Sequence, residues 1–287
     1  MSDSLISIIT VCFNSASTIK DTIESVLNQT HQNIEYILID GNSDDDTVSI
    51  IESYQKRFQQ KGITYKWISE PDNGIYDAMN KGVLLVNGEW IVYIGSDDYY
   101  KNNTVIENAI PKLIEANSNS IKYVYGKIEH INQNNELVEI SGKPWEEQRE
   151  RFSYIMNINH SGCFHHKTLF STHGKFNTTF KIAGDYELLL RELKNPSKRA
   201  FFINSVLIVM REGGVSGRLS NRLMVVTETQ RARKENHIYT FSKELFFWKV
   251  RVRIIHLISV IFGDRLSSIL ADFYRKTILG KQKRWSK

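Results

Sequence analysis

The sequence is poor in the features that mark secreted, membrane-spanning and cysteine-dependent proteins. Its 287 residues include two cysteines, Cys12 and Cys163, whose wide separation excludes a cysteine-based metal site and makes a reducing cytoplasm the simplest compartment. No stretch approaches the roughly 18 apolar residues of a spanning helix, so none is expected. Residues 1–15 lack a basic segment, and Asn14 breaks their apolar run, so no signal peptide is expected.

Charge is distributed unevenly along the chain. Residues 221–287 carry 15 Lys and Arg against 5 Asp and Glu, a net charge of +10, whereas residues 1–220 carry 22 against 27, a net charge of −5. A basic tail on a slightly acidic body indicates contact with an anionic surface. Nucleic acid and membrane both fit this pattern.

Apolar segments alternate with helical patterns in the first hundred residues. Strands are expected at 5–13, 34–40, 63–69 and 89–95, and each of the first three is followed by apolar residues at helical spacing. The first two strands are continuous apolar runs, which is typical of strands covered on both faces. This order predicts an α/β fold with a parallel, doubly wound sheet.

Polar and acidic side chains stand where these strands end, namely Asn14, Asp40, Glu70, Asp72, Asp97 and Asp98. Ligands of open parallel sheets bind at this edge. The segment after the first strand, TVCFNSAS, lacks the glycines of a phosphate-binding loop. A phosphate ligand would therefore need a cation held on acids, so the adjacent Asp97 and Asp98 predict a divalent metal rather than a simple turn.

The pattern changes after residue 120. KYVYGKIEHIN and ELVEI predict a hairpin, NINHSGCFHHKTLF a strand leading into a helix, residues 181–193 a helix, and RAFFINSVLIVM a strand. We therefore divide the chain into a body of residues 1–220, with halves of about 1–120 and 121–220, and a basic amphipathic helical tail of residues 221–287.

Five segments resemble family 2 of the glycosyltransferases in their order and spacing. They are SIITVCFNSASTIKDTIESVLNQT, YILIDGNSDDDT, SEPDNGIYDAMNKG, GEWIVYIGSDD and AGDYELLLR, all within residues 5–217. They are most similar to the bacterial branch that builds O-antigen and colanic-acid polysaccharides. The resemblance implies a GT-A fold, which is a Rossmann-like, mostly parallel sheet with a small antiparallel region on the acceptor side. It also implies a nucleotide-sugar donor, Mn²⁺ or Mg²⁺, and transfer with inversion at the anomeric carbon.

The resemblance assigns roles to single residues as well. Asp185 corresponds to the catalytic base, which accepts the proton of the attacking hydroxyl, and a helix N-cap is its alternative role. Asp40 corresponds to the residue that contacts the nucleotide base, with an Asx turn as the alternative. The implied donor-binding set is completed by Thr10, Asn14, Asp72, Asn73, Asp77, Asn80, Ser96, Asp97 and Arg218. His160 is assigned to the acceptor, although a lone histidine is more often structural.

Asp97 and Asp98 fill the place of the family's DXD element, where a bound Mn²⁺ or Mg²⁺ bridges the donor phosphates. Gly95 stands at the position of the usual first acid, which leaves ligation to Asp97 with Asp98 or water. Met79 stands where many relatives have an arginine that binds phosphate. Arg211 or Arg218, around the glycine-rich GGVSGR, could supply positive charge to the leaving group.

The tail has an apolar pattern of its own. As a helix, its first part would carry one apolar side, formed by Phe246, Phe247, Val250, Ile254, Leu257, Ile258 and Ile261. Such a helix can lie in the headgroup plane of an anionic membrane. Packing on the body or on a second copy of the chain is the alternative.

These features predict an inverting, metal-dependent glycosyltransferase that works on the inner face of the plasma membrane. It would move a hexose or N-acetylhexosamine from a UDP-linked donor to a lipid-linked saccharide in surface polysaccharide synthesis. A non-catalytic module that binds nucleic acid or membrane is an alternative, but a nucleic-acid binder places basic residues in its binding groove, and the motif here is acidic. A metal-dependent nucleotidyltransferase would usually show a glycine-rich, basic loop after the first strand, which TVCFNSAS is not. No nucleic-acid partner is expected.

Overall fold

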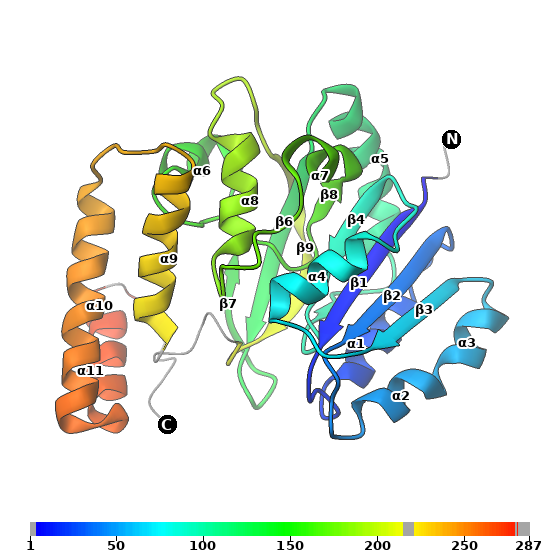
Figure 1. The fold of residues 1–287 in the computed structure, drawn as a ribbon, viewed down its shortest axis with the longest axis horizontal. Coiled ribbons are helices and arrows are strands. Elements are labelled where there is room, and N and C mark those ends of the chain that lie inside the picture. Colours follow the sequence, from blue (N-terminus) through cyan, green and yellow to red (C-terminus); the bar gives the residue numbers. More distant parts are fainter. Residues whose placement is uncertain (1–3, 215–220, 279, 281–287) are drawn as a thin grey trace.

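The computed structural model describes residues 4–214, 221–278 and 280 (Figure 1). Its centre is a nine-stranded sheet with the order β3-β2-β1-β4-β8-β6-β9-β5, in which β7 pairs with β6. Helices lie on both sides of this sheet, as the sequence predicts for an α/β fold.

The first half of the chain forms the parallel part of the sheet. It contains β1 (Ile6–Cys12), β2 (Ile34–Asp40), β3 (Thr64–Ser69) and β4 (Trp90–Tyr93), with β1 hydrogen-bonded to both β2 and β4. The four predicted strands are confirmed, although β4 ends two residues earlier than expected. The helix expected after β2 is divided at Tyr54 into α2 (Thr47–Ser53) and α3 (Gln55–Gln60).

The second half makes the sheet mixed. The predicted hairpin is formed by β6 (Tyr123–Ile131) and β7 (Leu137–Ser141), and β8 (Phe164–His166) lies antiparallel between β4 and β6. The last strand, β9 (Phe201–Arg211), runs parallel to β6 and antiparallel to the short β5 (Tyr99–Tyr100). Thus β8 and β9 bring the second half against the carboxyl end of β4.

Two buried cores flank the sheet, because successive side chains of a strand point to opposite faces. Ile8 of β1 packs with α1 (Ile19–Leu27), α2, α3 and α5 (Val105–Ser118). Ile9 packs on the other face, where the helices are α4 (Ile75–Val83), α6 (Trp145–Phe152), α7 (Lys167–His173) and α8 (Gly184–Leu193).

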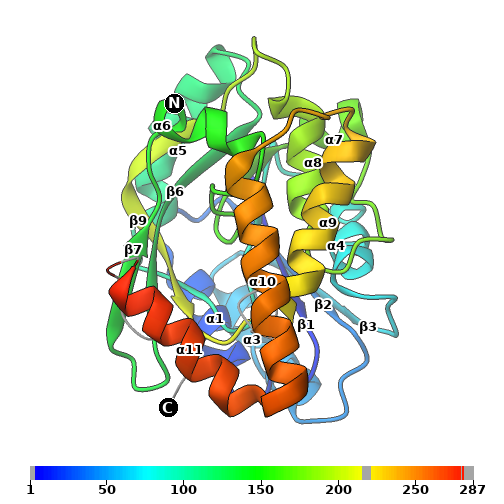
Figure 2. The same cartoon turned by 90° about the vertical axis from the view of Figure 1, so that its left-hand side faces the viewer.

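The described residues after 221 form three helices. They are α9 (Arg222–Glu235), α10 (Lys243–Phe262) and α11 (Asp264–Thr277). Figures 1 and 2 show α9 between α8 and α10, with α11 packed on α10 at an angle. Val226, Thr229 and Ala232 of α9 are buried, so this helix is packed on the body. Among the described residues, no helix has the length and apolar character needed to cross a membrane.

Candidate active site

The loop that follows β4 carries the two acids predicted to bind metal. Asp98 is 3% exposed, and its Oδ2 accepts a hydrogen bond of 2.6 Å from the hydroxyl of Ser161. Its Oδ1 is buried, and no described residue donates to it. Burial and the neighbouring Asp97 raise the pKa of Asp98 to about 7, and burial raises the pKa of Asp97 as well. Burial thus disfavours the charged forms of both carboxylates, which a bound cation would stabilise.

Gly95 explains why this site has no third acid. A Cβ atom at Gly95 would lie 2.9 Å from Oδ2 of Asp98 and 3.0 Å from Oδ1 of Asp97. Both carboxylates thus occupy the space that a side chain at Gly95 would need. Gly95, which stands in place of the family's usual acid, leaves room for the side chains of Asp97 and Asp98 to fold back over the loop.

The residues present fit a divalent cation. Mg²⁺ and Mn²⁺ favour carboxylate oxygens and usually keep ligands from water and substrate phosphates. No cluster of three or more histidine, cysteine, aspartate or glutamate side chains occurs within the described part of the chain, so Asp97 and Asp98 would hold the ion with help from outside the protein. The unpartnered Oδ1 of Asp98 is the oxygen best placed for this role.

Asp185 stands in the first turn of α8. Its Oδ1 accepts hydrogen bonds from the backbone N–H of Tyr186 (2.8 Å) and from the hydroxyl of Tyr76 (3.3 Å). The N-cap position belongs to Ala183, so Asp185 is not the capping residue that its alternative role describes. Gly184 allows this arrangement, because a Cβ atom there would lie 2.8 to 2.9 Å from the ring of Tyr76.

A short segment before β8 joins the two acidic groups. Ser161 contacts Asp98, and the preceding His160 is close enough to Asp185 for the aspartate charge to act on its ring. His160 stacks on Tyr93, its Nε2 is buried, and no described residue contacts that nitrogen. Burial lowers the pKa of His160, which favours a neutral ring. Two consecutive residues thus connect to the two predicted acidic groups, Ser161 through a hydrogen bond to Asp98 and His160 through the charge of Asp185.

The segment PDNGIYDAMN forms the turn before α4 and the helix itself. Asp72 lies against Gly41 and accepts from the N–H of Gly74 (2.7 Å). Asp77 accepts from the backbone N–H of Asn73 (3.0 Å), which stabilises the helix start. Asp72, Asn73 and Asp77 thus shape the turn beside the loop after β2, at the predicted donor edge of the sheet.

Asn80 does not reach the donor edge, and its predicted place in the donor set is corrected. Its side chain is 8% exposed, and its amide makes two hydrogen bonds of 2.9 Å with the backbone N–H and carbonyl of Phe176. The amide thus pairs with both backbone groups of Phe176, which holds this buried side chain inside the protein. Asn80 fastens α4 to the chain that leads into α8.

Thr10 is also corrected, because it lies inside the sheet rather than at its edge. The alternation of β1 places Thr10 on the same face as Ile8. Its side chain is fully buried, and its hydroxyl accepts a hydrogen bond of 3.0 Å from Tyr36. Thr10 contributes to the core beneath the site.

The loops after β1 and β2 are tied to each other. The N–H of Asn14 donates to Ser43 (2.8 Å), and its side-chain oxygen accepts from the N–H of Asp44 (3.0 Å). Ser96 joins the same network through the hydroxyl of Ser15 at 2.9 Å. Asn14 and Ser96 therefore stand at the predicted edge of the sheet.

Asp40 is fully buried in the same region. Both of its oxygens accept hydrogen bonds, from Ser43 and from the hydroxyl of Ser69. In this arrangement Asp40 anchors the loop after β2, as its turn alternative describes. Its contact with a nucleotide base stays a prediction that requires these serines to move.

Arg211 supplies the positive charge beside the metal acids. Its guanidinium donates to the backbone oxygen of Asp97 (2.9 Å) and to the carboxylate of Asp21 (2.5 Å), and it lies over the ring of Tyr99. Arg218, the other candidate, falls outside the described residues. Met79, which takes the place of the family's arginine, is buried in the core next to α8.

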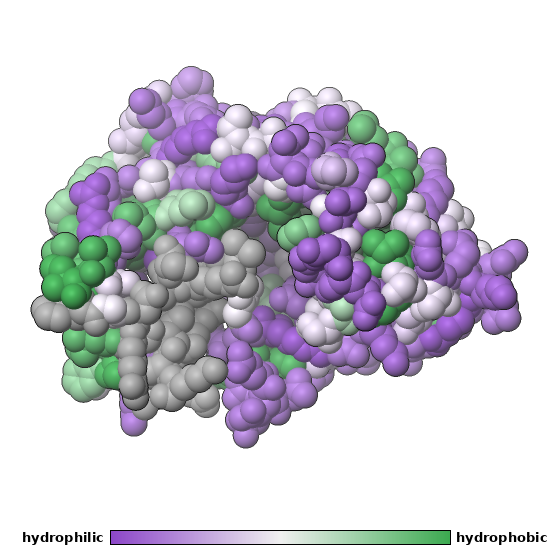
Figure 3. Space-filling view, turned by 60° about the horizontal axis from the view of Figure 1, so that its bottom comes forward, coloured by the Kyte–Doolittle hydropathy of each residue, from purple (hydrophilic) through white to green (hydrophobic). Residues whose placement is uncertain are grey.

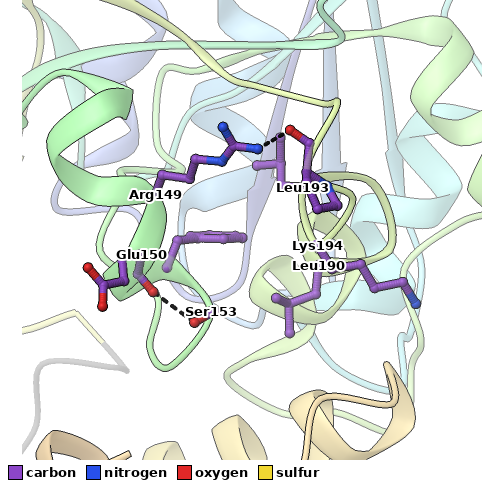
Figure 4. A pocket seen from close by; sticks show the side chains of 8 residues that line it. Arg149, Glu150, Ser153, Leu190, Leu193 and Lys194 are labelled. Atoms are coloured by element: carbon purple, nitrogen blue, oxygen red, sulfur yellow. Dashed lines mark hydrogen bonds between the residues drawn. The ribbon is translucent and has the colours of Figure 1, made fainter. Parts of the chain in front are cut away.

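A separate cavity of about 340 Å³ lies between α6 and α8 (Figure 4). Phe152, Leu190 and Leu193 line it together with Arg149, whose guanidinium donates to the backbone oxygen of Pro196. None of the predicted site residues takes part, so we assign this cavity no role in the chemistry.

Three residues at or beside the site were missed by the sequence analysis. Tyr76 and Ser161 contact Asp185 and Asp98, and Glu228 of α9 binds the backbone before α8. Tyr76 lies within SEPDNGIYDAMNKG, one of the segments that carry the resemblance, and Ser161 directly follows His160, so both stood beside predicted site residues. Glu228 had no such signal.

Comparison with known proteins agrees with the resemblance found in the sequence. Residues 7–173 match the family described as Glycosyl transferase family 2. The chain is 25% identical over 225 residues to a PGL/p-HBAD biosynthesis glycosyltransferase of Mycobacterium tuberculosis, an alignment that covers 77% of this chain and 83% of the relative.

Solved structures of glycosyltransferases share the fold. A mannosyltransferase of Pyrobaculum calidifontis in complex with GDP-Man and Mn²⁺ superposes with a TM-score of 0.63 at 14% identity, covering 96% of this chain and 81% of that one. TarS residues 1–349 of S. aureus in complex with UDP-GlcNAc superposes with a TM-score of 0.56 at 13% identity, covering 96% and 86%. Both are similar over nearly the whole of this chain.

Proposed function

The chain belongs to glycosyl transferase family 2 and has the GT-A fold, and from this premise we propose that it moves a hexose or an N-acetylhexosamine from a nucleotide sugar to a saccharide acceptor, with inversion at the anomeric carbon. The observation that carries the proposal is that the consecutive residues His160 and Ser161 connect to the two acidic groups. The structural neighbours bind UDP-GlcNAc and GDP-Man, which supports a nucleotide-sugar donor, with UDP as our choice of nucleotide.

We assign the base to Asp185. Its Oδ1 is held by Tyr76 and by the N–H of Tyr186, which leaves Oδ2 to accept the proton of the acceptor hydroxyl. General-base catalysis of this kind contributes about 10²–10⁴-fold to a rate. His160 is a neutral ring among aromatic side chains, and the charge of Asp185 acts on it, so we assign it to the acceptor.

We assign the metal to Asp97 and Asp98. When bound, Mn²⁺ or Mg²⁺ would stabilise the negative charge that develops on the leaving nucleoside diphosphate. Ser161 holds Oδ2 of Asp98, while Oδ1 has no hydrogen-bond partner among the described residues and is free to bind the ion. Arg211 fixes the backbone of Asp97 and adds positive charge beside the phosphates. Asn14, Asp72, Asn73, Asp77 and Ser96 complete the proposed donor edge, with Asp40 beneath it. Arg218, which lies outside the described residues, stays part of the proposed set.

A donor screen tests the proposal. We expect nucleotide release from UDP-, GDP- or dTDP-sugars to depend on Mn²⁺ or Mg²⁺, and one UDP-sugar to be the best donor. Release of nucleotide can be followed with a coupled assay, and transfer by mass spectrometry of the acceptor. If no nucleotide sugar is consumed in the presence of saccharide acceptors, the proposed function is wrong.

We further propose that the acceptor is a lipid-linked saccharide of surface polysaccharide synthesis of the O-antigen type, reached at the inner face of the plasma membrane. The support lies in α10 and α11. Exposed apolar side chains gather on these helices, at the left of Figure 3, and on α10 they are Phe246, Phe247, Val250, Ile254, Leu257, Val260 and Ile261. Most residues predicted for the apolar side of the tail are therefore uncovered.

Charge favours an anionic membrane as the partner of this face. Lys243 and Arg253 of α10 are exposed, and residues 221–287 carry a net charge of +10. Apolar side chains with flanking cations are what an interfacial helix presents to anionic lipid. The beginning of α10 is fixed to the body, because Leu245 is buried and Glu244 pairs with Arg151 of α6 (2.7 Å).

The intact protein should therefore sediment with anionic liposomes and be released by high salt, since charges are screened within about 10 Å at 0.1 M salt. Truncation before Phe241 keeps α9 and should leave a folded protein that binds donor. This protein should use a short water-soluble acceptor well and a long-chain lipid-linked acceptor poorly. Loss of both acceptors together with a lower melting temperature would instead show that α10 and α11 serve the fold or a dimer.

A further inference from the structure

A single carboxylate of the tail binds the chain that enters the helix with the proposed base. Glu228 of α9 is 7% exposed and accepts hydrogen bonds from the backbone N–H groups of Lys181 (2.8 Å), Ile182 (2.8 Å) and Ala183 (2.9 Å). A carboxylate accepts several hydrogen bonds, and bonds between a charged acceptor and N–H groups are stronger than neutral ones. Glu228 lies outside the residues that match the family, 7–173.

The residues bound by Glu228 lead directly to Asp185. The N-cap of α8 is Ala183, whose side chain cannot accept a hydrogen bond, and Glu228 holds the chain that enters the helix at this residue. The carbonyl of Ile182 accepts from the hydroxyl of Tyr76 (2.6 Å), which also contacts Asp185. The segment 181–183, which directly precedes Gly184, is thus held by Glu228 through its three N–H groups and by Tyr76 through the carbonyl of Ile182.

The same segment reaches the donor edge. The ammonium of Lys181 donates to the backbone oxygen of Asn73 (3.2 Å), in the turn before α4. Movement of residues 181–183 would therefore shift Asp185 and the turn at Asn73 relative to each other. This short piece of chain therefore connects the helix of Asp185 to the turn before α4.

Further contacts hold α9, and with it Glu228, against α8. The side-chain amide of Asn236, after the end of α9, donates to the backbone oxygen of Glu187 (3.4 Å), and the ammonium of Lys194 donates to the backbone oxygen of Asn236 (3.3 Å). Ala232 is fully buried between these ends. The two helices are therefore fixed to each other along their length, and the carboxylate of Glu228 is held at the start of α8.

We propose that Glu228 is a positioning residue of the transfer reaction, which fixes residues 181–183 so that the Asp185 carboxylate stands at the acceptor hydroxyl. The inference rests on the proposed role of Asp185 as base. It makes α9 a part of the active-site framework, although the helix contributes no side chain to the reacting groups.

The test is the isosteric variant Glu228→Gln in the full chain. Its amide nitrogen cannot accept from the backbone, so at least one N–H group loses its partner and the segment shifts. We expect kcat for sugar transfer to fall about ten- to a hundredfold, because displacement of a catalytic group by about 1 Å can cost a hundredfold. The KM for the donor should stay within about twofold. Glu235→Gln, an exposed glutamate at the end of the same helix, should behave as wild type.

A double variant shows whether Glu228 acts through Asp185. Glu228→Gln should add little further loss to Asp185→Asn, since a misplaced base and an absent base are equivalent. If the two losses multiply, or if Glu228→Gln transfers at the wild-type rate, the inference is overturned while wild-type activity keeps the proposed function intact. Loss of donor binding together with transfer in Glu228→Gln, checked by calorimetry and thermal melting, would also overturn it, because Glu228 would then serve the fold as a whole.

Discussion

Replacing Asp98 with asparagine should reduce turnover at least about a hundredfold. The substitution removes charge from the carboxylate whose Oδ1 has no hydrogen-bond partner among the described residues, and metal-held charge stabilisation is worth several kcal/mol. Asp97→Asn should have an effect of the same order. Steady-state rates at saturating Mn²⁺ measure both, with Asp46→Asn, an exposed acid in the loop before α2, as the control that keeps its activity.

Asp98→Asn should fold normally, which separates a lost metal from a lost fold. Burial already raises the pKa of Asp98 to about 7, so a neutral side chain suits this position when no cation is bound. Mn²⁺ should raise the melting temperature of the wild type and not of the variant. EDTA should abolish wild-type turnover, and Mn²⁺ or Mg²⁺ should restore it. Full activity in EDTA would show that the enzyme needs no metal.

Asp185→Asn should lose most transfer while it keeps its affinity for the donor. Loss of a general base costs about 10²–10⁴-fold. The asparagine oxygen can still accept from Tyr76 and from the N–H of Tyr186, so the first turn of α8 should remain folded. Calorimetry with the nucleotide sugar and a transfer assay measure the two properties separately. If the variant instead binds donor poorly and its folded fraction transfers at the normal rate, the base lies elsewhere.

The sequence predicts the parallel half of the fold well, for a physical reason. Strands buried on both faces are rich in apolar residues, and β1 and β2 are largely apolar runs in which Ser7, Thr10, Glu35 and Asp40 are the polar exceptions, so their place and type are clear. Their ends then locate the acids of the site, because parallel strands share one carboxyl edge. No comparable pattern in the sequence indicates that the helix after β2 is divided at Tyr54.

The roles of single residues were harder to predict, because they depend on which way a side chain faces. Thr10 could have been placed correctly, since it has the parity of Ile8 and so points into the core. Asn80 could not, because its partner, the backbone of Phe176, is distant in sequence. Glu228 likewise binds backbone N–H groups more than forty residues away, and no local pattern encodes such a contact.

The contacts of α4 with the second half of the chain affect how hybrid enzymes can be built. By sequence α4 belongs to the donor half, yet Asn80 pairs with Phe176, and Tyr76 binds the carbonyl of Ile182. An exchange of acceptor halves between relatives with a junction near residue 120 would separate these partners. A working hybrid must carry the inward face of α4 along with the segment that leads into α8, so the natural unit for transplanting acceptor specificity is discontinuous in the gene.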